Sequence, residues 1–110
     1  MLNFKEYQTE AQKTVTYPNV GDNYVFPTLG LTGEAGEIAN KVKKIERDHA
    51  GIVTDEVRES IAAELGDLLW YLAALSTELG LDLEAIAKEN LEKLASRQQH
   101  GTLRGVGDGR

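Results

Sequence analysis

Four carboxylates are spaced so that they could bind a divalent cation. Glu34 and Glu37 are three residues apart, and so are Glu64 and Asp67. In a helix, residues at this spacing lie on one face about a turn from each other, so each pair can hold a cation between its carboxylates. Neither pair includes a His or Cys. An all-oxygen set of this kind favours Mg²⁺, or Mn²⁺, over zinc.

The second acid pair lies in an unusually apolar segment. From Ile61 to Ser76 the only charged residues are Glu64 and Asp67, and we expect this helix to be buried nearly all round. Neighbouring carboxylates in such a place repel each other and lose solvation unless a cation or a proton satisfies them. Exposed acids that only keep the helix soluble are the alternative. The matching pair upstream makes a metal site the better hypothesis.

Two lysines follow the first acid pair. Projected at about 100° per residue, Glu34, Glu37, Lys41 and Lys44 occupy one arc of a helix. This order would place cationic groups beside a metal, where they could bind phosphate oxygens. A helical ion pair between Glu37 and Lys41 is an equally good interpretation of the lysines. His49, in an expected loop, is interpreted as solvated surface.

Hydrophobic spacing predicts an all-α domain with four main helices that hold these residues. The predicted helices run from an N-cap at Asn3 to before Tyr17, from near Pro27 to about Arg47, from an N-cap at Thr54 to around Gly80, and from an N-cap at Asp82 to Arg97. The domain would span residues 1–97, and residues 98–110 would form a Gly-rich tail.

The third predicted helix also carries a leucine-rich seam. Its members recur in alternating steps of four and three, which is typical of a helix that packs against another helix: Ile61, Leu65, Leu68, Leu72, Leu75 and Leu79. A chain of 110 residues has room for one small core. We therefore expect the four-helix bundle to be completed by oligomerisation.

Composition excludes several classes of protein. The net charge of −6 argues against binding to a nucleic-acid backbone, which depends on clustered Lys and Arg. The uncharged stretches are too short for a membrane-spanning helix, which needs about 20 apolar residues. The absence of cysteine and of a secretory signal at the N-terminus predicts a cytoplasmic protein.

The acid pairs resemble the signature of the MazG-like members of the all-α nucleoside triphosphate pyrophosphohydrolase superfamily. That signature is ExxE, a spacer and ExxD, which here reads Glu34-Ala-Gly-Glu37 and then Glu64-Leu-Gly-Asp67. The segment NLEKLASR is similar to the family's Asn-x-x-Lys-x-x-x-Arg element. That similarity gives three further candidate residues, which would bind the substrate: Asn90, Lys93 and Arg97.

The resemblance implies Mg²⁺-dependent hydrolysis of nucleoside or deoxynucleoside triphosphates between the α and β phosphates. The products would be a nucleoside monophosphate and pyrophosphate, and the role would be nucleotide-pool housecleaning. It implies catalytic and metal-binding roles for the four acids and a site shared within a homodimer or a dimer of dimers. Two alternatives stay open. One is a phosphoribosyl-ATP pyrophosphohydrolase of histidine biosynthesis, and the other is a non-catalytic helical interaction module.

Overall fold

The computed structural model describes residues 1–101, and within this range the chain forms α-helices and no strands. The helices are α1 (Phe4–Gln12), α2 (Val25–Asp48), α3 (Asp55–Glu78) and α4 (Leu83–Gln99). The predicted all-α fold with four main helices is confirmed. The last helix continues past Arg97, and most of the predicted tail, residues 102–110, lies outside the described range.

Three predicted N-caps are confirmed. The side chains of Asn3, Thr54 and Asp82 accept hydrogen bonds from backbone N–H groups in the first turns of α1, α3 and α4, at 2.8, 3.2 and 3.1 Å. Each bond satisfies an N–H group that has no partner inside its helix. These helix starts depend on residues close in sequence, which is why the sequence locates them well.

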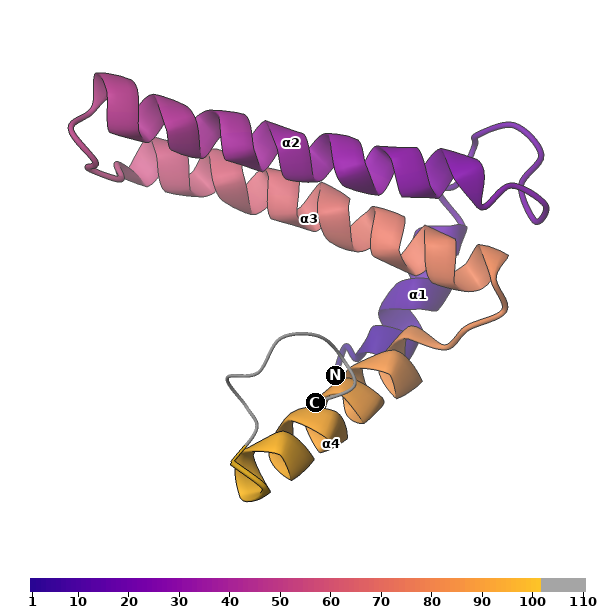
Figure 1. The fold of residues 1–110 in the computed structure, drawn as a ribbon. Helices are drawn as coiled ribbons and strands as arrows, with labels where there is room; N and C mark the ends of the chain where they lie inside the picture. Colours follow the sequence, from indigo (N-terminus) through magenta and orange to yellow (C-terminus); the bar gives the residue numbers. More distant parts are fainter. Residues whose placement is uncertain (102–110) are drawn as a thin grey trace.

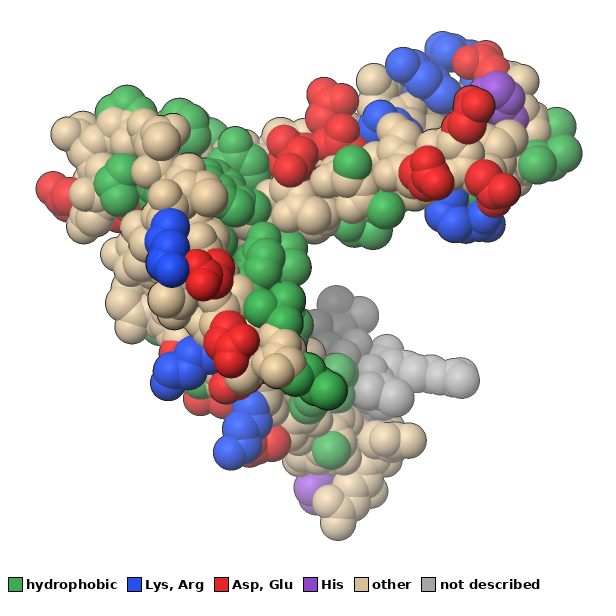
Figure 2. Space-filling view, turned by 180° about the vertical axis from the view of Figure 1, so that it is seen from behind, with side chains coloured by type: hydrophobic (Ala, Val, Ile, Leu, Met, Phe, Trp, Pro, Cys, Tyr) green, Lys and Arg blue, Asp and Glu red, His purple; other side chains and the backbone are tan. Residues whose placement is uncertain are grey.

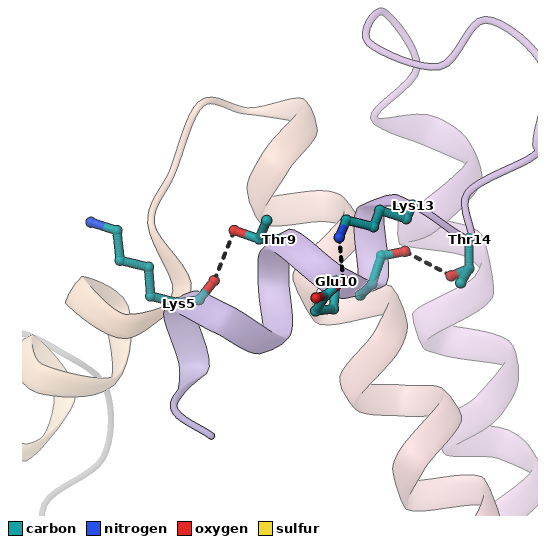
Figure 3. A network of polar contacts seen from close by, with 6 residues as sticks. Lys5, Thr9, Glu10, Lys13 and Thr14 are labelled. Carbon is teal, nitrogen blue, oxygen red and sulfur yellow. Dashed lines mark hydrogen bonds and ion pairs between the residues drawn. The ribbon is translucent and has the colours of Figure 1, made fainter. Parts of the chain in front are cut away.

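Helix α1 ends at Gln12 and is shorter than predicted, and a side chain just past its end contacts α3. The Thr14 hydroxyl donates to the Ala11 carbonyl at 2.7 Å and accepts from Trp70 Nε1 of α3 at 2.7 Å. The Thr14 side chain thus links the end of α1 to α3. Figure 3 shows the hydrogen bond from Thr14 to the Ala11 carbonyl, beside the ion pair between Lys13 and Glu10 at 2.7 Å.

The segment before α2 is held by a glutamate at the end of α3. The Glu78 carboxylate accepts hydrogen bonds from the Tyr17 hydroxyl at 2.5 Å and from the N–H groups of Gly21 and Asn23 at 2.8 Å each. Asn23 in turn accepts from Phe26 N–H at 3.0 Å in the first turn of α2, which begins at Val25, near the predicted Pro27. The rings of Tyr17 and Phe26 stack with centroids 4.9 Å apart.

Helices α2 and α3 form a long hairpin, and the short α1 crosses one end of α3 (Figure 1). Helix α4 extends away from the hairpin, and no contact joins it to α2 among residues 1–101. The small core lies where α1, α3 and the start of α4 meet. It consists of buried Ala11, Ala73 and Leu83, with Tyr7, Leu69 and Trp70 packed against them.

The single chain is an open structure. Its radius of gyration is 16.8 Å, whereas a compact chain of this length has about 13 Å. Hydrophobic side chains gather in the inner angle between the hairpin and the α1–α4 arm (Figure 2). No helix in the described range is both long and apolar enough to cross a membrane.

The prediction that the third helix is buried nearly all round is wrong for the single chain. In α3 Leu65 and Leu72 are 51% and 38% exposed, and Leu79, just past the end of the helix, is 52% exposed. The hydrophobic spacing of the fourth helix also predicts a buried row: Leu83, Ile86, Ala87, Asn90, Leu91 and Leu94. Of this row only Leu83 is buried in the single chain, and Leu91 is 67% exposed. The reason is the open arrangement, in which α1 and α2 cover α3 on part of its surface and the middle of α4 has no helix packed against it among residues 1–101.

Candidate metal centre

Three of the four predicted acids come together between α2 and α3. One carboxylate oxygen from each of Glu34, Glu64 and Asp67 lies within 4.8 Å of the other two. Glu34 comes from α2, and the other two come from one face of α3, at the spacing that places them a turn apart. Carboxylate oxygens this close match the ligands of a hard divalent cation.

The environment of Glu34 leaves its charge unsatisfied. Its Oε2 atom is buried, and no hydrogen-bond donor from residues 1–101 reaches it. A close contact with the Glu64 carboxylate, burial, and the negative charges of Glu64, Asp67 and Glu37 raise the pKa of Glu34 to about 7. The group therefore needs either a proton or an external cation, and its surroundings fit a metal ion.

Glu37 lies outside this cluster of three. Its side chain is exposed, one turn further along α2. Its charge still acts on the cluster, since it contributes to the raised pKa of Glu34. The structure thus places Glu37 at the edge of the candidate site.

Among residues 1–101, Lys41 is the cation that forms an ion pair with one of the acids. Its Nζ donates to Ser60 Oγ at 2.6 Å and lies 3.9 Å from Glu64 Oε1. The alternative ion pair with Glu37 does not form among the described residues, because Lys41 reaches across to α3 instead. A single ammonium at 3.9 Å from one carboxylate cannot neutralise three acids.

Two residues beside the acids were missed in the sequence. Ser60 precedes Glu64 by one helical turn, and that spacing was the signal available for it. Tyr7 of α1 lies close enough to Asp67 that burial, together with the Asp67 charge, raises the pKa of the Tyr7 hydroxyl. No local pattern points to Tyr7, since α1 and α3 are far apart in sequence.

A small pocket with cationic walls adjoins this region on the side of the hairpin loop. Its volume is about 210 Å³, and it is lined by Lys41, Lys44, Ile45, His49, Val57 and Ser60. Both predicted phosphate-binding lysines contribute to it. His49 lines it as well, although the sequence suggested only solvated surface. The pocket shares Lys41 with the acid cluster, so positive and negative groups are adjacent.

The three candidate residues on α4 are not brought to the acids within one chain. Asn90 and Lys93 are exposed, and Arg97 is buried with 6% of its surface accessible. Their helix makes no contact with α2 among the residues described. A site that combines all nine predicted residues would therefore need a second copy of the chain.

Comparisons with known proteins agree with this architecture. The MazG nucleotide pyrophosphohydrolase domain matches residues 27–102, a range that includes nearly all of α2 and the whole of α3 and α4. The "Gene 37 protein" of Mycobacterium phage L5 is 48% identical over 109 residues, covering 94% of this chain and 96% of that protein.

A second relative is an uncharacterized protein, YvdC, of Bacillus subtilis (strain 168). It is 32% identical over 75 residues, which cover 64% of this chain and 71% of that protein. No solved structure matches the chain. Because the domain match contains both acid pairs and spans most of the helical structure, the chain belongs to the MazG nucleotide pyrophosphohydrolase family.

Proposed function

We propose that this protein hydrolyses nucleoside or deoxynucleoside triphosphates between the α and β phosphates, yielding a monophosphate and pyrophosphate. The observation that carries the proposal is Glu34, whose Oε2 atom is buried without a hydrogen-bond donor from residues 1–101 and whose carboxylate lies with two others inside 4.8 Å. A protein that only needed a soluble helix face would leave such acids in water. Family membership supports hydrolase chemistry on nucleotides.

The candidate cofactor is Mg²⁺, with Mn²⁺ as an alternative. Glu34, Glu64 and Asp67 would hold it, and Glu37 would reach in from the edge of the site. When bound, the ion would supply positive charge next to the triphosphate oxygens and lower the pKa of water at the site. The chain itself supplies the oxygen ligands, and one of its glutamates is the candidate proton acceptor.

Basic residues beside the acids would bind the phosphates. Lys41 and Lys44 line the cationic pocket, and Lys41 also lies 3.9 Å from Glu64. A triphosphate could therefore touch the metal site and the pocket together. Positive groups aimed at a leaving pyrophosphate stabilise the charge that develops there.

We further propose that the active unit is a homodimer or a dimer of dimers. The half-exposed leucines of α3 and the radius of gyration of 16.8 Å leave apolar surface that a second copy would cover. Such a copy could also bring Asn90, Lys93 and Arg97 to the acids of the first chain. Sedimentation should show a species of at least twice the 12.1 kDa chain mass. A monomer at micromolar concentration would contradict this assembly.

The activity is tested with a panel of nucleotides, Mg²⁺ and identification of the products. Monophosphate plus pyrophosphate supports the proposal, and the fastest substrate identifies the role, with nucleotide-pool housecleaning in the cytoplasm as our expectation. Preferential turnover of phosphoribosyl-ATP would instead favour the histidine-pathway alternative. No turnover of any nucleotide, with Mg²⁺ still raising the melting temperature, would favour a non-catalytic interaction module.

A further inference from the structure

In the hairpin, the ring of Tyr71 in α3 packs directly against the backbone of α2 at Gly30. Three ring carbons of Tyr71 in α3 occupy the space that a Cβ atom on Gly30 of α2 would need. The other α2 glycines, Gly33 and Gly36, have open space there, and so does Gly66 of α3. Gly30 is thus the glycine of these helices whose lack of a side chain is required by packing.

This contact lies directly beside the acid cluster. Gly30 precedes Glu34 by four residues, and Tyr71 follows Asp67 by four residues. Residues four apart share one face of a helix, so the ring and the glycine lie on the same seam as the carboxylates, about one turn away. Because the helices run in opposite directions, both partners lie on the same side of the cluster.

The side chains at a helix crossing set the distance between the helix axes. A ring resting on bare backbone holds α2 near α3 at a fixed separation, and one turn further on Glu34 must reach the oxygens of Glu64 and Asp67. Mg²⁺ demands ligand distances of about 2.0–2.1 Å in near-ideal geometry. A small increase in helix separation would therefore withdraw Glu34 from a common ion.

We propose that Gly30 and Tyr71 are positioning residues that set the α2–α3 separation at the metal centre. The inference rests on the proposed function for the metal centre itself. It concerns the ring of Tyr71 and not its hydroxyl, since the atoms that fill the notch are Cδ1, Cε1 and Cζ. Neither residue touches the ion in this proposal.

The test measures Mn²⁺ affinity by calorimetry or electron paramagnetic resonance, with helix content followed by circular dichroism. Gly30→Ala should bind Mn²⁺ at least about 10-fold more weakly, the loss typical when groups that orient metal ligands are changed. Gly33→Ala and Gly36→Ala are matched controls on the same helix, and both should stay within about 2-fold of the wild type, well short of that loss. Equal affinity of Gly30→Ala and the wild type would overturn the proposal.

Substitutions of the ring complete the test. Tyr71→Phe keeps the ring and should bind Mn²⁺ like the wild type, and a loss would assign the role to the hydroxyl and overturn the proposal. The double variant Gly30→Ala/Tyr71→Val removes the three ring carbons, makes room for the added methyl group and should regain affinity, even if Gly30→Ala alone loses helix content. If the double variant folds but binds Mn²⁺ as weakly as Gly30→Ala, the proposal that Gly30 and Tyr71 set the helix separation would be contradicted. Failure of the wild type to bind Mn²⁺ would overturn the metal centre as well, whereas equal binding by Gly30→Ala leaves the proposed function intact.

Discussion

Glu34 and Glu78 are glutamates of the same helical hairpin in opposite electrostatic environments. Glu78 accepts three hydrogen bonds from its own chain, and these bonds lower its pKa. Glu34 faces other carboxylates with a buried oxygen that no donor from residues 1–101 reaches, and its pKa is raised to about 7. The charge of Glu78 is stabilised by hydrogen bonds within the fold, whereas the charge of Glu34 requires a cation or a proton from outside it.

The largest expected effect comes from removing a carboxylate at the metal centre. Glu64→Gln should lower Mg²⁺-dependent pyrophosphate release by roughly 100-fold or more, since a catalytic ion contributes several kcal/mol to the reaction. Glu59→Gln is the matched control, because Glu59 is an exposed acid of the same helix. Full activity of Glu64→Gln in a clean preparation would refute the site assignment.

The comparison of the two glutamates predicts opposite effects on stability without metal. Glu78→Gln should lower the melting temperature by roughly 5 °C, because charge-assisted hydrogen bonds to the loop become neutral ones. Glu34→Gln should raise it at pH 8, because repulsion within the cluster is relieved. Thermal denaturation in EDTA measures both shifts. If both substitutions lowered the melting temperature, the Glu34 carboxylate would have stabilising partners within the fold.

Stability should also depend on pH with a sign set by Glu34. A carboxyl whose folded pKa is raised from 4.5 to about 7 contributes stability below its unfolded pKa and loses it as pH rises through about 7. The metal-free melting temperature should therefore fall between about pH 5 and pH 8. Below that window the lowered pKa of Glu78 acts in the opposite sense, since its contribution is lost as pH falls.

Two measurements sharpen this pH dependence. Mg²⁺ at pH 8 should restore the melting temperature, because the ion replaces the proton on the cluster. In Glu34→Gln the fall between about pH 5 and pH 8 should become shallower, since the titrating group is gone. A slope that is the same in the variant and the wild type would assign the pH dependence to another group.

The smallest expected effect concerns the link between Lys41 and α3. Ser60→Ala removes the 2.6 Å hydrogen bond from Lys41 while its 3.9 Å approach to Glu64 stays possible. Stability should fall by about 1 kcal/mol or less, measured by urea denaturation. Weaker binding of substrate with little change in kcat would indicate that Ser60 orients Lys41 toward phosphate. Unchanged KM would limit Ser60 to a structural role.

Local sequence patterns predicted the helix starts and the acid pairs correctly. The sequence did not predict features that depend on contacts between residues far apart in the chain. Asn3, Thr54 and Asp82 cap their helices through residues two or three positions away, so sequence suffices. Just past the early end of α1, Trp70 of α3 donates a hydrogen bond to Thr14. The path of the loop before α2 depends on Glu78 of α3, which accepts from Asn23 N–H. Neither of these two partners is visible in a local pattern.

The sequence by itself determined the all-α class, the caps and the spacing of the carboxylates, because periodicity and local hydrogen bonds fix these features. Only the tertiary structure decided that Glu34, Glu64 and Asp67 meet while Glu37 stays at the edge, and that Lys41 turns toward Ser60. It also decided that α4 stands apart from the hairpin. The physical reason is that helix separation and crossing depend on contacts such as Tyr71 against Gly30, which join residues far apart in the chain.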